Sequence, residues 1–428
     1  MADSLDKDIL VKKVIEQVEK LFGQVDFIKE IEIKKEIRNG AGPDFVVELS
    51  AGESRRMLLV ETRLNGEPRF AREAVNALLV KMNMWSHAYP VFAAPYISEK
   101  GAEICREHKV GYLDLAGNCH LSFENFHIQA SGHVNPFKAK RSMKSLSSVK
   151  TARIIRVLLN HPNREFITEE LAKEAGVSTG LVSGVKNRLR DEELVVDRKK
   201  RITVANPAAL LERWITESRG LEEIVYRYFV PLDFIMVENK IVDYFGEKGV
   251  NCAFTGLSGA VHLASGINYN QVHAYIDDDN ALPGEKDGFM TRNGRTTVLF
   301  IKSPDDGVFY GARRVMPASR LQYCDPSEKT VDEIEAEIRV TTQIVSPIQV
   351  YHDLQRFSLR WMGDKAMRTA SIGGGDGVGG GGGGDGGDGG GGGNDGGGGG
   401  GGDDAAAAFA AIAAAAEKIY RQVIEPSW

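Results

Sequence analysis

A chain of 428 residues is long enough for two to four domains, and its 42% hydrophobic content is typical of globular proteins. The net charge of −6 excludes a protein that is basic throughout, so any contact with nucleic acid has to be confined to a local basic segment. The four cysteines form no CxxC pair and the nine histidines are scattered, which predicts reduced thiols in a cytoplasmic protein and no metal site.

Residues 1–137 are predicted to form an α/β domain. Hydrophobic periodicity and turn residues predict helices at residues 7–22, 69–84 and 98–109, strands at residues 27–37, 44–50, 55–63 and 89–95, and further strands over residues 112–123 and onward. The resulting order, αβββαβαβ, resembles that of the restriction-endonuclease-like fold of the PD-(D/E)xK nucleases.

Two carboxylates and a cation, Asp44, Glu61 and Arg63, match the nuclease motif of that fold. If a four-residue loop follows Ser50, then Ser50 pairs with Arg55 and Asp44 lies opposite Glu61. Their Cβ atoms are then about 4.5–5.5 Å apart, close enough for the carboxylates to share Mg²⁺. The motif normally ends in lysine, whereas Arg63 stays protonated and is a poor general base. The sequence therefore favours an inactive scaffold in which Arg63 pairs with a carboxylate, and a nuclease is the alternative.

Residues 145–206 are predicted to form a winged helix-turn-helix domain. Helices are expected at residues 151–160, 169–175 and 178–190, with a short strand after the first helix and a two-stranded wing at residues 194–204. Thr168 is expected to cap the second helix and Ser178 the third. Gly176, in the turn between them, is expected to adopt the left-handed conformation that ends a helix.

The third helix of this domain is predicted to be amphipathic. Its apolar side chains, Leu181, Val182, Val185 and Leu189, point inward. The opposite side and the wing tip carry groups that can contact phosphates or base edges, which are Ser178, Thr179, Ser183, Lys186, Asn187, Arg190, Arg198, Lys199, Lys200 and Arg201.

Positive charge is concentrated in this part of the chain. Residues 138–201 hold 16 Lys and Arg against 8 Asp and Glu, a net charge of +8, whereas both flanking segments are acidic. Binding to the phosphate backbone through release of counterions needs such a local concentration of cations. The alternative is a winged helix that contacts only protein and whose charges are solvated.

Residues 207–428 are predicted to form a mixed α/β domain. Helices are expected at residues 208–219 and 221–229 and from Pro347 onward, and strands at residues 235–237, 272–276, 296–301, 308–310 and 338–340. Residues 373–402 contain 24 glycines in 30 positions, which predicts an insert without a packed core.

One enzymatic hypothesis concerns this third domain. Nucleotidyltransferases present a Gly-Ser or Gly-Gly turn followed by paired carboxylates on a strand that hold Mg²⁺. Gly256 and Ser258 precede Asp277 and Asp279 in that manner. The alternative is that the aspartates belong to an ordinary solvated loop.

The chain resembles the AbiEi-type antitoxins of type IV toxin–antitoxin systems and their regulator relatives. The matching pieces are the winged helix and residues 255–260, 346–354 and 424–428. The resemblance implies a DNA-binding autorepressor whose C-terminal domain opposes a nucleotidyltransferase-like toxin. The nuclease-like domain before the winged helix is a departure from the simple antitoxin pattern.

The sequence thus favours a cytoplasmic, sequence-specific transcription regulator that binds a double-stranded operator, as a homodimer, and is not an enzyme. The helix at residues 178–190 would enter the major groove while the wing contacts phosphates. No cofactor is expected, and Mg²⁺ is required only in the nuclease or nucleotidyltransferase alternatives. No apolar run reaches membrane-spanning length and the charged first residues are not typical of a signal peptide, so no membrane partner is expected.

Overall fold

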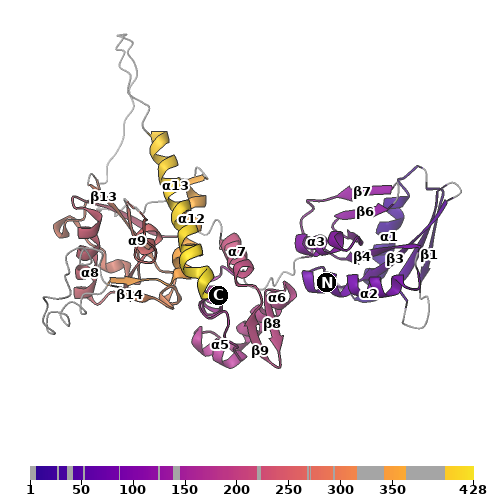
Figure 1. Ribbon diagram of the computed structural model, residues 1–428, viewed down its shortest axis with the longest axis horizontal. Coiled ribbons are helices and arrows are strands. Elements are labelled where there is room, and N and C mark those ends of the chain that lie inside the picture. The colour runs from indigo at the N-terminus through magenta and orange to yellow at the C-terminus, as the bar shows by residue number, and fades with distance from the viewer. Residues whose placement is uncertain are drawn as a thin grey trace, which may run out of the picture. The chain divides into compact units, whose positions relative to one another are not determined.

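We describe the protein from a computed structural model. It describes residues 6–428 except residues 27, 36–41, 52–53, 86, 124–125, 138–144, 219–222, 268, 270, 293–294, 316–341 and 363–400. The chain is an α/β protein with mixed sheets, and it divides into two compact units (Figure 1). The first unit comprises residues 1–143 and 183–205, and the second comprises residues 144–182 and 206–428. The three-domain division expected from the sequence uses other boundaries and stays a prediction.

The first unit is built on a seven-stranded sheet whose strands follow one another in chain order. The strands are β1 (Glu30–Lys35), β2 (Phe45–Ala51), β3 (Ser54–Thr62), β4 (Ala88–Ala94), β5 (Gly111–Asp114), β6 (Cys119–Phe123) and β7 (Phe126–Ala130). The central strands β3, β4 and β5 are parallel, and the outer pairs are antiparallel. This order confirms the sequence of helices and strands predicted for the domain.

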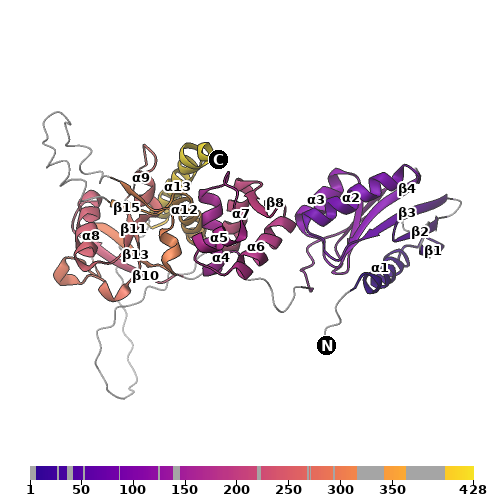
Figure 2. The ribbon, with the colours of Figure 1, turned by 90° about the horizontal axis from the view of Figure 1, so that it is seen from below.

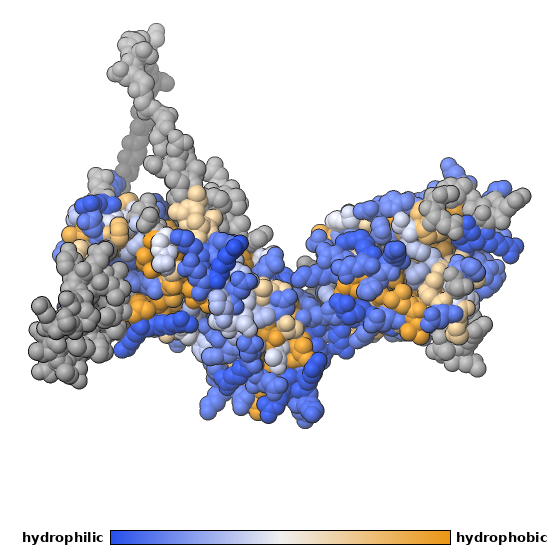
Figure 3. Space-filling model, viewed as in Figure 1, coloured by the Kyte–Doolittle hydropathy of each residue, from blue (hydrophilic) through white to orange (hydrophobic). Residues whose placement is uncertain are grey.

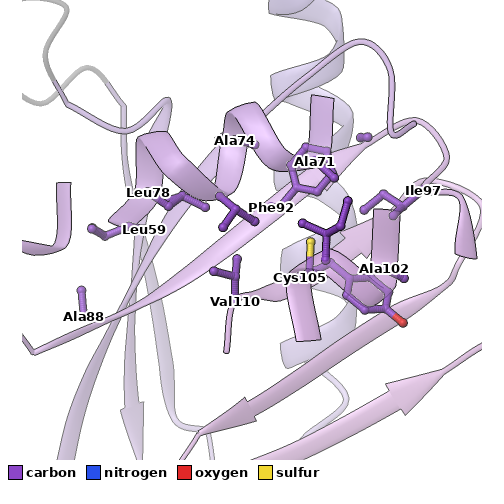
Figure 4. Packing of buried hydrophobic residues seen from close by; sticks show 14 of the residues in the cluster. Leu59, Ala71, Ala74, Leu78, Ala88, Phe92, Ile97, Ala102, Cys105 and Val110 are labelled. Atoms are coloured by element: carbon purple, nitrogen blue, oxygen red, sulfur yellow. The ribbon is translucent and has the colours of Figure 1, made fainter. Parts of the chain in front are cut away.

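Helices cover both faces of this sheet. Figure 2 shows α1 (Lys7–Phe22) on one face and α2 (Pro68–Met82) and α3 (Glu99–Glu107) on the other. Leu10, Val14 and Phe22 of α1 pack in one buried cluster, and α2 and α3 pack in a second cluster around Phe92 of β4 (Figure 4). Because β4 is covered on both faces, its sequence is apolar throughout, as expected for a parallel strand inside a sheet.

The three helices and the hairpin of the predicted winged helix-turn-helix are present in the expected order, but the short strand predicted after the first helix is absent from residues 161–167, where Phe166 forms a single bridge. They are α4 (Val149–Asn160), α5 (Thr168–Glu174), α6 (Thr179–Asp191) and the hairpin of β8 (Val195–Arg198) and β9 (Arg201–Val204). One capping prediction is wrong. Helix α5 begins at Thr168, so Ile167 is the N-cap residue, and the Glu170 carboxylate accepts a long hydrogen bond, 3.4 Å, from the Ile167 N–H. Thr168 cannot cap a helix whose first turn contains it.

The second unit contains a six-stranded mixed sheet in the order β10-β13-β12-β11-β15-β14. The strands are β10 (Val225–Val230), β11 (Cys252–Thr255), β12 (Gln271–Ile276), β13 (Thr296–Lys302), β14 (Arg313–Val315) and β15 (Thr342–Ile344), and the helices are α7 (Pro207–Ser218), α8 (Phe234–Lys248), α9 (Gly256–Val261), α12 (Pro347–Met362) and α13 (Gly401–Ile419). In Figure 1, α8 lies on one face of the sheet and α9 and α12 on the other.

Several of the elements predicted for the third domain are wrong. Residues 221–229 are predicted to be helical, but strand β10 begins at Val225, and residues 235–237 lie inside helix α8. Residues 308–310 overlap the 3-10 turn Asp306–Phe309 instead of a strand. Short apolar runs have similar patterns in buried strands and helices, so tertiary context decides between them.

Other predictions fall partly or wholly on residues that the structure does not describe. The strand predicted at residues 338–340 and most of the glycine-rich insert lie outside the described residues, and Gly401 and Gly402 are the first residues of α13. Cys105, Cys119 and Cys252 are free thiols, as expected. Among the described helices, none combines the length and apolar character needed to cross a bilayer.

Candidate nucleic-acid interface and carboxylate pair

The turn between α5 and α6 has the predicted geometry. Gly176 has a φ of +63°, in the left-handed region, and the N–H of Val177 donates to the carbonyl of Ala172 at 2.9 Å. This pairing closes the C-terminal turn of α5. The Ser178 hydroxyl accepts from the N–H of Leu181 at 3.3 Å, so Ser178 caps α6 as predicted.

The predicted polar face of α6 is exposed only in part. Ser178, Thr179 and Asn187 are exposed, whereas Ser183, Lys186 and Arg190 are partly buried. Of the four apolar residues expected to point inward, Val182, Val185 and Leu189 are buried and Leu181 is partly buried.

The two basic residues of this face differ in their contacts. Lys186 forms an ion pair of 2.8 Å with Asp197 on β8, and only 18% of its side chain is exposed. The side chain of Arg190 is 37% exposed. Its Nε is buried and has no hydrogen-bond partner within the described part of the chain. Arg190 NH2 lies 3.7 Å from Asp191 Oδ1, a longer ion pair than that of Lys186 with Asp197.

The wing is a hairpin with a two-residue turn. Arg198 pairs with Arg201, and the turn residues Lys199 and Lys200 have φ angles of 52° and 66°. The turn is therefore shorter than predicted, because Asp197 lies within β8 and pairs with Ile202. Figure 3 shows hydrophilic residues at the end of this hairpin.

This wing tip breaks two rules of hairpin stability. A two-residue turn with both φ angles positive favours Asn-Gly, and each lysine in this conformation costs about 1–2 kcal/mol. Like charges directly opposite one another, as at Arg198 and Arg201, are also destabilising. The wing tip thus holds four adjacent cations on an exposed turn, and this arrangement lowers the stability of the hairpin. The cations are Arg198, Lys199, Lys200 and Arg201.

The carboxylate pair of the first unit is arranged as the register predicts. Ser50 pairs with Arg55 and Phe45 with Val60, which places Asp44 opposite Glu61. The pairing continues through Ala51 and Ser54, so the loop is shorter than expected although the register is the same.

Asp44 is neutralised within the unit. Its carboxylate lies 2.6 Å from Lys7 Nζ, and the N–H and hydroxyl of Thr62 both donate to it at 2.7 Å. Burial raises the pKa of the Asp44 carboxyl, but the Lys7 ion pair and the Thr62 hydrogen bonds outweigh it, so the net pKa is lowered from the usual value of 3.8.

Glu61 is held by two cations. Arg63 NH1 lies 2.6 Å from one carboxylate oxygen and Lys81 Nζ lies 2.5 Å from the other, with 7% of the Glu61 side chain exposed. The contact between Arg63 and Glu61 is the one predicted for an inactive scaffold. Lys81 was missed, because the sequence predicts helix α2 but not which of its residues faces the end of β3.

The remaining polar groups of this region have structural partners. Asp114, the last residue of strand β5, is buried and accepts hydrogen bonds from the N–H groups of Ile97 and Asn118 at 3.1 and 2.8 Å. Within the described ranges, no group of three or more His, Cys, Asp or Glu residues is arranged to hold a metal ion.

The nucleotidyltransferase arrangement predicted in the third domain does not form. Strands β11 and β12 are antiparallel, with Thr255 paired to His273 and Cys252 to Ile276. Gly256 therefore lies at one end of this strand pair and Asp277 at the other, roughly 15 Å apart at the rise of a β-strand. The Asp277 carboxylate accepts instead from the N–H of Asn251 at 3.0 Å, as in the alternative of an ordinary loop.

A buried hydrogen-bond network in the second unit joins Thr255 of β11 to residues of α12 and α4. The hydroxyl of Thr255 donates to the buried Asp353 carboxylate at 2.6 Å, and Gln349 Nε2 donates to the same group at 2.7 Å. Arg156 of α4 donates in turn to Gln349 at 2.7 Å. The closing residue Trp428 donates from its indole to a backbone carbonyl of α4 at 3.4 Å.

Two buried histidines, His273 and His352, lie beside this network. The ring of His273 stacks on Phe357 and that of His352 on Trp214, with centroid distances of 5.0 and 4.1 Å. Burial lowers the pKa of each histidine to about 4. Both are neutral at pH 7 and act as core residues.

Comparison with known proteins gives two partial matches. No known family model matches the chain. The germination protease of Halalkalibacterium halodurans is 30% identical over 126 residues, which is 29% of this chain and 32% of that protein. The chain therefore spans about a third of the length of this relative. The solved structure of EndoMS in its apo form has a TM-score of 0.18 and 12% identity, covering 27% of this chain and 48% of that one. Neither match places the chain in a family.

Proposed function

We propose that the protein is a sequence-specific DNA-binding transcription regulator that uses α6 and the wing of β8 and β9. The observation that carries this proposal is the wing tip. Four adjacent cations on a strained, exposed turn weaken the hairpin, and such a departure is expected where the charges bind an external polyanion. The exposed polar residues Ser178, Thr179 and Asn187 of α6 support the same proposal.

A salt titration tests this proposal. The protein is mixed with a fluorescent 40-base-pair duplex of random sequence, and binding is measured by anisotropy at several salt concentrations. Replacing all four wing cations by alanine should lower the slope of log affinity against log salt by up to about 3.6, at about 0.9 for each phosphate that is no longer neutralised.

A matched variant controls for the loss of net charge. It replaces four exposed lysines of the first unit, Lys12, Lys13, Lys20 and Lys29, by alanine. The control should keep the slope of the unmodified protein. Equal slopes for the wing variant and the control would show that the wing does not bind DNA.

The finer proposal is that the regulator is an autorepressing antitoxin of a type IV toxin–antitoxin system. It rests on the resemblance and is supported by the hydrogen bond between two of its pieces, Thr255 and Asp353. The proposal predicts a nucleotidyltransferase-like gene beside this one, and it predicts that co-expression relieves growth arrest by that gene product. A neighbouring gene of another class, or arrest that persists, would contradict it.

The second candidate function is that of a Mg²⁺-dependent nuclease with the restriction-endonuclease-like fold. The observation in its favour is that Asp44 and Glu61 lie opposite one another with Lys81 on Glu61. Incubation of plasmid with the protein and Mg²⁺ or Mn²⁺, beside an Asp44→Ala control, tests it. Nicking by the protein that is absent in the control would make the nuclease the better proposal.

A further inference from the structure

The C-terminal end of α6 carries two cations, Arg188 and Arg190, and three carboxylates. The helix ends at Asp191, and Glu192 and Glu193 follow directly. The carbonyl end of a helix bears partial negative charge, which favours cations and disfavours carboxylates. The ion pairs of Arg188 with Glu192, at 2.9 Å, and of Arg190 with Asp191, at 3.7 Å, offset part of this.

Glu193 is also an unusual residue for its backbone position. Its φ is +57°, and the N–H groups of Glu193 and Leu194 donate to the carbonyls of Arg190 and Leu189 at 3.0 and 2.8 Å. This is the hydrogen-bond pattern of a helix ending in which glycine is normally preferred. A glutamate in this left-handed conformation strains the backbone, so its side chain is expected to make a contact that compensates for the strain.

The N-terminal end of α2 shows the opposite imbalance. The helix begins at Pro68 after the N-cap residue Glu67 and has no acidic residue in its first turn. Close to its start it carries Arg72 and also Arg69, which pairs with Glu73 at 3.2 Å. The N-terminal end of a helix bears partial positive charge, which disfavours cations and favours carboxylates.

The two helix ends neutralise one another within the first unit. Arg72 binds Glu193 in a bidentate manner, with Nε and NH2 each 3.0 Å from a different carboxylate oxygen. Arg69 NH1 lies 3.4 Å from Asp191 Oδ1. Each pair puts a carboxylate at the positive end of α2 and a cation at the negative end of α6.

We propose that the basic start of α2 is a docking site for the acidic end of α6, and that this ionic contact regulates DNA binding by α6 and the wing. The regulatory part rests on the DNA-binding function proposed above. The paired side chains are 22–48% exposed, so each pair is weak and screened by salt, as a reversible contact requires.

Hydrogen exchange of the full-length protein tests the docking without DNA. In Arg72→Glu, the amides of Phe70, Ala71 and Leu194 should exchange about two- to fivefold faster, the effect of losing one exposed ion pair. Adding Glu193→Arg reverses the charges and should restore the original rates. Lys100→Glu, an equal charge change at an exposed residue of α3, should leave the rates unchanged. Equal rates in Arg72→Glu and Lys100→Glu, or no recovery in the charge-reversed pair, would overturn the docking.

A second variant separates docking from folding. Glu193→Gly removes the carboxylate and relieves the left-handed strain, so the melting temperature should not fall. The amides of Phe70 and Ala71 should nevertheless exchange faster. If their exchange does not change, the docking proposal is wrong.

DNA binding tests the regulatory part on the same variants, with the random 40-base-pair duplex as probe. Arg72→Glu removes the cation that binds Glu193, so this variant should bind about two- to fivefold more weakly than the charge-matched Lys100→Glu. The charge-reversed pair should bind like the original protein. Equal affinities of Arg72→Glu and Lys100→Glu for the duplex would overturn the regulation, even if hydrogen exchange supports the docking. Failure of the unmodified protein to bind any duplex would overturn the regulation together with the proposed function, while exchange still decides the docking.

Discussion

The wing tip and the Asp44–Glu61 pair are both charged clusters in the first unit, but their charges are balanced in different ways. The carboxylates are neutralised within the unit by Lys7, Arg63 and Lys81. At the wing tip, cations lie beside and opposite one another on an exposed turn. Charges balanced inside a protein stabilise it, whereas like charges concentrated at a cost to stability indicate an external ligand of opposite sign.

The largest effect is expected from removing the shared carboxylate. Glu61→Ala leaves Arg63 and Lys81 close together without their anion, and breaking a mostly buried ion pair in this way should destabilise the first unit by about 2–3 kcal/mol. The measurement is hydrogen exchange of the β3 amides in the full chain. Glu16→Ala, at an exposed residue of α1, is the control. A destabilisation equal to that of the control would mean that the carboxylate cluster is not a stabilising network.

A smaller effect is expected on base recognition by α6. Arg190→Ala should reduce discrimination between a selected duplex and its single mismatches by about 1–2 kcal/mol. Lys186→Ala should reduce it less, because Lys186 is already bound to Asp197. Anisotropy with each mismatched duplex measures both. A larger loss of discrimination in Lys186→Ala than in Arg190→Ala would show that the ion pair with Asp197 does not keep Lys186 from contacting bases.

The strain in the wing can be relieved at the expense of its charge. Replacing Lys199 by Asn and Lys200 by Gly should stabilise the hairpin by about 1 kcal/mol and weaken binding to every duplex. Hydrogen exchange of the β8 and β9 amides measures the stability of the hairpin, and fluorescence anisotropy measures the affinity for each duplex. Replacing both lysines by arginine keeps charge and strain and should change neither. If the Asn-Gly variant had a more stable hairpin but bound every duplex as tightly as the original protein, the wing lysines would not bind DNA.

Acid should weaken the ion pair between Asp44 and Lys7. Because the folded-state pKa of Asp44 is lowered, its stabilising contribution is present above the unfolded value of about 3.8 and is lost as pH falls through the folded pKa. Urea unfolding of the first unit between pH 2 and 7 should therefore show less acid dependence in Asp44→Asn. Identical pH profiles for the two proteins would contradict the ion pair with Lys7.

Local sequence patterns predict most of the first domain and only part of the third, where the helices at residues 208–219 and from Pro347 onward and the strands at residues 272–276 and 296–301 are confirmed. The opposition of Asp44 and Glu61 follows from one hairpin, because the pairing of Ser50 with Arg55 fixes every other pair. The ion pair of Lys81 with Glu61 does not follow, since it depends on how α2 is rotated against the sheet. The predicted placement of Gly256 beside Asp277 is wrong because β11 and β12 are antiparallel, and local sequence patterns do not show the relative direction of two strands.

The unusual residues of α6 and the wing are visible in the sequence only as charges. Residues 198–201 form a basic run, and the backbone conformation of Lys199 and Lys200 is visible only in the structure. The same holds for Glu193, whose left-handed backbone lies inside an ordinary acidic run. Their strain is a property of φ angles, which composition and periodicity do not encode.

The division of the chain into units has a consequence for synthesis. The first unit is made of residues 1–143 and 183–205, and residues of the second unit separate these segments. The seven strands of the first sheet leave the ribosome before residues 183–205 are made, and domains generally begin to fold as they emerge. Most of α6 and the wing would therefore be made after the strands of the sheet, so the first unit is completed in two steps.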